Sequence, residues 1–261
     1  MKVFLQGDGR KGSDAIGSEE WIYGVNPVLE ALRANRDIKG LYLVSGRWGK
    51  LKGITAEAEK RNIPVTVSDP GFFDRRFPKG HQGVAARVSR KDLASLDDLL
   101  SIPSRKNEIP LFLVLDGIED PRNLGAILRS VDAVGAHGAV IQTHRAAPLG
   151  SEVSKTSAGA VEYVSVAMVP NIKHAILRMK EEGITVIGAE ADVLPSLWEV
   201  DLKIPLCVVI GSEGKGMRRT VREKCDYLVS LPMRGRVNSL NVSVAAGITL
   251  FEVLRQRLAK N

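Results

Sequence analysis

Three short stretches of the sequence combine cations, amides and glycines in a way that suits ligand chemistry. They run from Asp116 to Ser130, from Val208 to Met217 and from Leu231 to Leu254. Each stretch begins within or at the end of an apolar run typical of a strand. All three lead into a predicted helix. Because ligands of open α/β sheets bind beyond the carboxyl ends of the strands, these stretches form the candidate site.

The stretch from Leu231 to Leu254 carries the densest polar pattern. Pro232 ends a short strand, and a loop of cations and small hydrogen-bonding groups follows: Arg234, Arg236, Asn238, Ser239 and Asn241. A helix comes next, with apolar residues three or four apart on one stripe: Val244, Ile248, Phe251, Leu254 and Leu258. A polar loop between buried elements is a usual place for binding. An ordinary strand-loop-helix crossover would show the same pattern.

The other two stretches are less specific when each is taken alone. Asn123 opens the first predicted helix, and Arg129 follows six positions later. Arg129 is either a ligand-binding cation or an ordinary surface cation on an amphipathic helix. In the second stretch, Gly211, Gly214 and Gly216 would let the backbone approach a ligand closely. This is not a phosphate-binding P-loop, because no Lys-Ser/Thr pair follows the last glycine.

The residues from 110 onward alternate between apolar strands and helices, which predicts an open parallel sheet with helices on both faces. Residues 111–116 form an almost continuous apolar run, as expected when both faces of a parallel sheet are covered. Further strands are predicted at 139–142, 163–166, 185–189, 206–210 and 227–231. Helices are predicted at 124–134, 171–182 and 218–224.

Residues 21–89 read as a second, smaller α/β unit. A helix begins at Asn26-Pro27, another spans 54–61, and strands are predicted at 41–44, 65–67 and 84–88. The unit is rich in Arg and Lys, so it is either a solvated surface or an RNA-backbone platform on which Trp48 or Phe72 stacks a base. A polar linker at 90–109 with one short helix follows this unit. A mobile arm at 1–20 precedes it, in which Gly7, Gly9 and Gly12 mimic a dinucleotide fingerprint without the flanking strand and helix.

Composition limits the partners. The chain has 261 residues, enough for two domains, and its net charge of +7 with a sequence pI of about 9.5 favours an anionic partner such as nucleic acid or an acidic membrane surface. No apolar run reaches the ~18 residues of a spanning helix. Cys207 is predicted to be a buried thiol, and His137 and His144 to be loop residues without metal spacing. These features predict a cytoplasmic protein without a metal site.

Taken in order, the three stretches resemble the motifs of the SpoU/TrmH family of RNA ribose 2′-O-methyltransferases, in the SPOUT class. Asn123, Gly125 and Arg129 match its first motif, Gly211, Glu213 and Gly216 its second, and residues 232–245 its third. The segment from Gly214 to Cys225 is most similar to the branch that methylates a guanosine ribose in 23S rRNA. Residues 21–89 resemble the ribosomal-protein-L30e-like RNA-binding domain of that branch.

The resemblance implies a parallel-sheet catalytic domain at 110–261 that contains a trefoil knot, although knots are very rare. It also implies S-adenosylmethionine as cofactor and a homodimer formed through the catalytic domain, to which the apolar C-terminal helix contributes. The implied cofactor-binding residues are Ala189, Glu190, Ile210, Gly211, Gly216, Leu231, Met233, Ser239, Leu240 and Asn241. The segment from Gly159 to Val164 either shapes the RNA entrance or forms a structural helix.

The implied catalytic residues are Arg129, Asn123, Glu213, Ser239 and Asn241. In the family the residue matching Arg129 helps to activate the ribose hydroxyl. Because arginine keeps its proton above pH ~12, a clamp that aligns the hydroxyl is a simpler role than a base. Glu213 is either the base or an acceptor that positions the motifs. Alternatives are methylation of tRNA, a non-catalytic RNA-binding protein, and a nucleotide-dependent oxidoreductase, for which residues 116–118 lack the required glycines.

Overall fold

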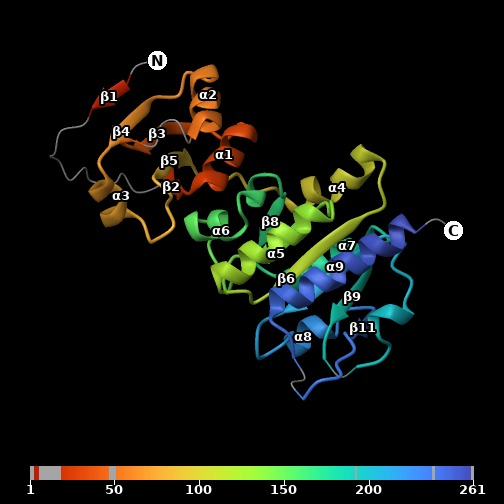
Figure 1. The fold of residues 1–261 in the computed structure, drawn as a ribbon. Helices are drawn as coiled ribbons and strands as arrows, with labels where there is room; N and C mark the ends of the chain where they lie inside the picture. The colour runs from red at the N-terminus through yellow and green to blue at the C-terminus, as the bar shows by residue number, and fades with distance from the viewer. Residues whose placement is uncertain (1–2, 6–18, 47–50, 192, 237–238, 260–261) are drawn as a thin grey trace. The chain divides into compact units, whose positions relative to one another are not determined.

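The computed structural model describes residues 3–5, 19–46, 51–191, 193–236 and 239–259 (Figure 1). The chain forms two compact units. Unit 1 contains residues 1–92 and 149–163, and unit 2 contains residues 93–148 and 164–261. This division differs from a single boundary at 110. Most of the predicted linker belongs to unit 2, and the segment 149–163 belongs to unit 1. None of the described helices combines the length and the apolar composition that crossing a membrane requires.

Unit 1 is built on a mixed sheet in the order β1-β4-β3-β5-β2. Its central strand β3 is parallel to β4 and antiparallel to β5, and β2 is antiparallel to β5. Residues 3–5, expected in a mobile arm, form the short strand β1 beside β4, while Gly7, Gly9 and Gly12 lie outside the described residues. The strands are β1 Val3–Leu5, β2 Glu19–Tyr23, β3 Ile38–Val44, β4 Val65–Ser68 and β5 Val84–Ser89.

Alternating side chains divide the core of unit 1 between the two faces of this sheet. Ile22 faces helices α1 (Val25–Arg33) and α2 (Lys52–Lys60) in an aliphatic cluster. Its neighbour Tyr23 belongs to an aromatic cluster with Phe73 of helix α3 (Pro70–Arg76). Each face is thus covered by a different helix layer.

The segment Leu149–Tyr163 is part of unit 1, although in the sequence it lies between two strands of unit 2. It contains helix α6 (Ser151–Thr156) and the 3-10 turn η2 (Ala160–Glu162), which pack against β2 and α1. Gly159 has φ +91°, and a Cβ there would lie 2.6 Å from Cβ of Glu30. The close approach and the left-handed backbone both require glycine. The described contacts of this segment are therefore those of a structural element.

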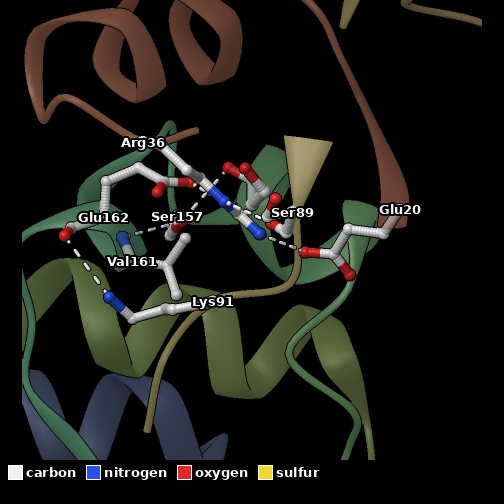
Figure 2. A network of polar contacts seen from close by, with 8 residues as sticks. Glu20, Arg36, Ser89, Lys91, Ser157, Val161 and Glu162 are labelled. Atoms are coloured by element: carbon white, nitrogen blue, oxygen red, sulfur yellow. Dashed lines mark hydrogen bonds and ion pairs between the residues drawn. The ribbon is translucent and has the colours of Figure 1, made fainter. Parts of the chain in front are cut away.

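Figure 2 shows the buried polar network that holds this segment in unit 1. Arg36, whose side chain is 8% exposed, pairs with Glu20 and donates to the Glu162 carboxylate at 2.7 Å and to the carbonyl of Ser89 at 3.0 Å. Lys91 donates to the carbonyl of Glu162 at 3.3 Å. Burial raises the pKa of Glu162 and lowers the pKa of Lys91, because both charges are removed from water.

Unit 2 is built on a six-stranded sheet in the order β11-β9-β10-β6-β7-β8, in which every pair is parallel. The predicted open parallel sheet is confirmed, and every residue of its central strands β10 and β6 is buried. The strands are β6 Leu111–Asp116, β7 Gly138–Gln142, β8 Val166–Val169, β9 Thr185–Ala189, β10 Leu206–Gly211 and β11 Tyr227–Val229.

Helices cover both faces of this sheet. The helices α4 (Leu96–Lys106), α7 (Ile172–Glu181) and α8 (Arg219–Arg222) contribute Leu99, Ile176 and Val221 to one apolar cluster with Phe112 and Val209. The helices α5 (Pro121–Ala133) and α9 (Val242–Leu258) pack against each other, and α9 also contacts β10 (Figure 1). Side chains of opposite parity in the central strands therefore meet different helix layers.

Two sequence predictions for this region are wrong in their bounds. The strand predicted at 163–166 is β8 at Val166–Val169, because Tyr163 ends the segment that packs in unit 1 and its hydroxyl donates to Glu30 at 2.7 Å. The short helix predicted in the linker continues as α4 to Lys106 through Pro103, and Leu99 on it is fully buried. The short helix was therefore predicted correctly, and the contact of α4 with β8 accompanies its greater length.

The loop from β9 to β10 contacts the chain on both sides of the 231–241 loop. Ser230, before that loop, donates its N–H to Pro195 at 3.2 Å, and its carbonyl accepts from Leu197 at 2.8 Å. Gln256, after it, accepts from the N–H of Leu202 at 2.9 Å and donates to Val200 at 3.1 Å. The β9–β10 loop is thus bonded to the chain before and after the 231–241 loop, and the trefoil knot implied by the resemblance stays a prediction.

Candidate active site

Two adjoining cavities open at the carboxyl ends of the strands of unit 2. We call them the β9 cavity, of about 330 Å³, and the β6 cavity, of about 460 Å³. The loop 212–216 that follows β10 lines both of them, as does Val242 at the start of α9. Ligand pockets have volumes of this order, and a shared wall would bring two bound molecules close together.

The β9 cavity collects the residues that the resemblance assigns to the cofactor. Every one of them except Asn241 lines it. The walls come from the ends of β9 and β10, from the loop 231–240 and from the first turn of α9. The lining residues are Ala189, Glu190, Ala191, Ile210, Gly211, Ser212, Glu213, Gly214, Lys215, Gly216, Leu231, Met233, Ser239, Leu240, Val242 and Ala245. Asn238, in the same loop, lies outside the described residues.

The glycines of the 211–216 loop have different roles. Ser212 and Gly216 exchange backbone hydrogen bonds of 3.1 and 2.9 Å, which closes a tight turn. A Cβ on Gly211 would lie 2.2 Å from the backbone of Gly216 and of Met217. The turn itself therefore requires glycine at position 211, and the expected approach of its backbone to a ligand stays a prediction. Gly216 has φ +64° and open space where a Cβ would stand, so its backbone is accessible from the cavities.

One residue from each motif takes part in a chain of side-chain hydrogen bonds. Asn241 donates to Asn123 Oδ1 at 3.1 Å, and Asn123 Nδ2 donates to Glu213 Oε2 at 3.0 Å. Asn241 is fixed in turn because its Oδ1 caps α9 by accepting from the N–H of Ser243 at 2.9 Å. Asn123 is buried and lines the β6 cavity. The chain holds Glu213 at the wall that the two cavities share.

The local structure around Asn123 differs from the prediction. Helix α5 begins at Pro121, and Asp120 caps it by accepting from the N–H of Arg122 at 2.8 Å. Asn123 therefore lies inside the first turn instead of opening the helix. This releases its amide from capping, so that the amide can bond Asn241 and Glu213.

The structure does not bring all predicted catalytic residues to one place. Arg129 is exposed on α5 and lines neither cavity. Ser239 lines the β9 cavity, whereas Asn123 lines the β6 cavity. Of the predicted catalytic residues, only Glu213 lines both cavities. Within one chain, Asn123, Glu213 and Asn241 form a connected group, and Arg129 stands apart from it.

The sequence interpretation missed an ion pair in the β6 cavity. Asp116, at the end of β6, accepts from the backbone N–H of Arg218 at 2.8 Å and from its Nε at 2.7 Å. Arg218 Nη2 also donates to Gln142 at the end of β7, at 2.8 Å. A signal was available, because an aspartate that ends a fully apolar strand must have a partner when buried. The sequence does not say which cation supplies it.

The structure describes only part of the RNA platform that the sequence predicts in unit 1. Trp48 lies outside the described residues. Phe72 is half-buried and stacks on Tyr42 with ring centroids 5.5 Å apart, so one partner of its ring is already protein. The exposed guanidinium of Arg76 lies 4.7 Å from the ring of Trp21. Exposed cations remain along this unit, among them Arg33, Arg75, Lys79 and Arg87.

The histidines and cysteines have structural environments. Among the described residues, His, Cys, Asp and Glu form no group of three or more that could hold a metal. His137 lies in the loop before β7, as predicted. Its buried ring accepts from the N–H of Leu111 at 3.1 Å and meets Glu108 at 3.0 Å, and burial lowers its pKa. Cys207 is fully buried, as predicted, and burial raises its pKa.

Comparison with known proteins identifies the class to which this fold and site belong. Residues 110–251 match the model of the SpoU rRNA Methylase family, and residues 21–94 match the model described as RNA 2′-O ribose methyltransferase substrate binding. The chain is therefore an RNA ribose 2′-O-methyltransferase. It belongs to the SpoU/TrmH family.

Relatives extend this similarity over nearly the whole chain. A putative TrmH family tRNA/rRNA methyltransferase of Bacillus subtilis is 44% identical over 91% of this chain and 96% of its own length. The 23S rRNA (guanosine-2′-O-)-methyltransferase of Pseudomonas aeruginosa is 40% identical over 91% and 97%. The SpoU methyltransferase AviRb of Streptomyces viridochromogenes, solved with its cofactor AdoMet, superposes with a TM-score of 0.78 at 27% identity, covering 92% of this chain and 91% of its own.

S-adenosylmethionine is the cofactor, and the β9 cavity fits it chemically. Apolar side chains of Ile210, Leu231 and Leu240 can enclose an adenine ring, and the accessible backbone at Gly216 and the hydroxyl of Ser239 can hold its polar edge. When bound, the cofactor supplies an already activated methyl group on a sulfonium. The protein then needs to orient the acceptor and remove its proton, without a metal.

Proposed function

We propose that this enzyme methylates the 2′-hydroxyl of a guanosine in 23S rRNA. The observation that carries the proposal is the chain Asn241–Asn123–Glu213, which links the three motifs at the wall between the two cavities. The substrate rests on relatives that are about 40% identical over nine-tenths of this chain and are named for that reaction. The Bacillus subtilis relative, named for tRNA or rRNA, supports tRNA as the second candidate. A ribosomal substrate would be met in the cytoplasm.

In the proposed mechanism the acceptor ribose lies in the β6 cavity beside the shared wall. Asn123, held by two side-chain hydrogen bonds, orients the ribose, and Asn241 positions Asn123. Glu213 accepts from Asn123, and its side chain is the group at the wall that can take the hydroxyl proton or fix the loop. Ser239 faces the cofactor. Binding groups held in this way convert a slow encounter into an oriented reaction.

Arg129 enters this mechanism through a second copy of the chain. The apolar stripe of α9 predicted from the sequence does not face the core: Val244, Ile248, Phe251 and Leu258 are exposed. This helix lies against α5, since a Cβ on Gly247 would be 3.5 Å from Ser130 Oγ, and Ser130 follows Arg129. We infer a homodimer in which these stripes meet and Arg129 reaches the acceptor phosphate at the partner's cavity.

Methyl transfer tests the proposal directly. Labelled S-adenosylmethionine is incubated with total rRNA and with total tRNA, and the product is mapped by nuclease digestion. We expect label in a 2′-O-methylguanosine of 23S rRNA. Label in tRNA alone would keep the chemistry and overturn the substrate. No label in either RNA would contradict the proposal, and intact binding of S-adenosylhomocysteine would then favour a non-catalytic RNA-binding role.

The role of Arg129 has its own test. Arg129→Ala should lower the rate about 10²- to 10³-fold and leave binding of S-adenosylhomocysteine unchanged, since the residue lies outside the β9 cavity. Phe251→Ser should convert a dimer to a monomer in analytical ultracentrifugation and lower the rate similarly. Arg105→Ala, on the exposed side of α4, is the control for both. Wild-type activity of the Arg129 variant would remove the residue from the mechanism.

A further inference from the structure

The β6 cavity contains an arginine that is anchored more firmly than a surface cation requires. Asp116 is 2% exposed, and both of its carboxylate oxygens accept from Arg218. Gln142 accepts from Nη2 on the other side. The contacts of Nε and Nη2 fix the plane of the guanidinium, while the backbone N–H of Arg218 binds the second oxygen of Asp116. A buried acid that holds an arginine in one orientation makes the arginine a preorganised donor.

The anchoring leaves one side of the guanidinium facing the cavity. Among the described residues, Nε and Nη2 of Arg218 have hydrogen-bond partners and Nη1 has none. The side chain of Arg218 is 37% exposed and lines the β6 cavity. The two N–H groups on Nη1 can therefore donate to a ligand that enters.

A carboxylate stands in the same cavity. Glu119 and Asp120 both belong to the loop between β6 and α5 and line the cavity. Asp120 is engaged as the cap of α5, through the N–H of Arg122. Glu119 is exposed, and its two oxygens can accept from a pair of neighbouring donors. The cavity thus offers a fixed donor and an acceptor pair.

Guanine is the base that complements this pattern. It carries an acceptor at O6, beside the donors N1–H and the 2-amino group. Adenine has a donor in place of O6 and lacks the 2-amino group, so it would face Arg218 with like polarity and leave Glu119 unmatched. Wrong pairings of this kind cost discrimination because desolvated polar groups remain unpaired.

We propose that the β6 cavity receives the base of the acceptor nucleotide, and that Arg218 and Glu119 select guanine. Asn123 and the 212–216 loop line the same cavity, so a base bound there would have its ribose close to the wall shared with the cofactor. The assignment rests on the proposed ribose methylation and adds to it the two residues that read the base. The base itself undergoes no reaction.

Replacing single functional groups of the acceptor base tests the two contacts. Synthetic RNA carrying the mapped acceptor nucleotide is made with guanosine, inosine or adenosine at that position. Guanosine and inosine differ only in the 2-amino group, which probes Glu119. Inosine and adenosine differ at position 6, which probes Arg218, and at N1, where only inosine offers a hydrogen to Glu119. The quantity compared is kcat/KM for methyl transfer, with binding of S-adenosylhomocysteine measured in parallel.

We expect the wild-type enzyme to prefer guanosine to inosine and inosine to adenosine, by about 10-fold at each step. Glu119→Gln should reduce the first step to about 2-fold and lower the second in part, because Glu119 also accepts from N1–H, which adenosine lacks. Arg218→Lys should reduce the second step and leave the first, since lysine can still neutralise Asp116 but lacks the planar fork. Arg219→Gln is the matched control, because Arg219 neighbours Arg218 but lines neither cavity and pairs with Glu223.

Two outcomes would overturn the assignment. Unchanged guanosine, inosine and adenosine ratios in both the Glu119 and Arg218 variants would show that these residues do not read the base. An acceptor mapped to a nucleotide other than guanosine would exclude guanine selection while RNA methylation stands. If Arg218→Lys loses its fold or its cofactor binding, the exposed Glu119 variant still decides.

Discussion

Each unit of this protein contains a buried carboxylate paired with an arginine, and the two pairs differ in what surrounds the arginine. In unit 1, the side chains of Glu162 and Arg36 are 3% and 8% exposed, and Arg36 is enclosed by protein acceptors (Figure 2). In unit 2, Asp116 is as deeply buried, but Arg218 reaches a cavity. The burial of the carboxylate therefore does not tell a structural ion pair from one at a ligand site. The two kinds of pair differ in whether the arginine also faces a cavity.

The comparison predicts the largest loss of stability from the enclosed pair. Arg36→Met would leave Glu162 and Glu20 without their cation in a buried position, which costs about 3–5 kcal/mol of unfolding free energy. Urea unfolding measures it. Arg33→Met is the control: Arg33 forms an exposed pair with Glu30 one helical turn away, worth less than about 0.5 kcal/mol. Equal losses in the two variants would mean that the network of Figure 2 is not structural.

A site residue should show the opposite balance, with a large effect on rate and a small one on stability. Asn123→Ala breaks the chain between Asn241 and Glu213 and should lower methyl transfer about 10²- to 10³-fold, with an unfolding cost of about 1 kcal/mol. Asn171→Ala is the matched control, since Asn171 only caps α7 through the N–H of Lys173. It should cost similar stability without loss of rate. A rate loss in both variants would point to a general loosening of unit 2.

The smallest expected effect concerns pH. Burial raises the pKa of Glu162, so its contribution to stability is present below its ordinary value of 4.5 and is lost as the pH rises through the folded value. Glutamine does not titrate. Glu162→Gln should therefore gain stability relative to wild type between pH 4.5 and pH 8, by about 1.4 kcal/mol for each unit of pKa elevation.

Thermal and urea unfolding at several pH values would measure this difference. Asp97→Asn is the control, because the side chain of Asp97 is 81% exposed in its pair with Arg178. Its stability relative to wild type should change little with pH. A gain that falls as the pH rises would show that Arg36 outweighs burial at Glu162.

The sequence predicted the parallel sheet because its evidence is local. The apolar run of β6 is consistent with a strand covered on both faces, and the residues to which the family resemblance assigns the cofactor line the β9 cavity, except Asn241. Local patterns also explain the errors. The short helix predicted in the polar linker exists, but its continuation to Lys106 was missed, and the valines after Tyr163 suggested a strand three residues too early.

Pairing at a distance could not be predicted. Arg36 and Glu162 are 126 positions apart, and Arg218 and Asp116 are 102 apart. Nothing in the neighbourhood of either arginine distinguishes it from the other cations of a basic chain. The apolar stripe of α9 was correctly found, but periodicity cannot say whether such a stripe faces the core or the solvent. Only the fold decides that Val244 and Phe251 are exposed.

The placement of Leu149–Tyr163 in unit 1 also governs the order in which the protein can mature on the ribosome. When position 92 has left the exit tunnel, Arg36 and Lys91 still lack the residue that completes their network. The 71 residues that separate position 92 from position 163 take roughly 4 to 14 s to synthesise at about 5–20 residues per second. During that interval Arg36 and Lys91 have no Glu162 to bind, and most strands of the parallel sheet have not been synthesised. Unit 1 can therefore complete its buried network only after the first strands of unit 2 have been synthesised.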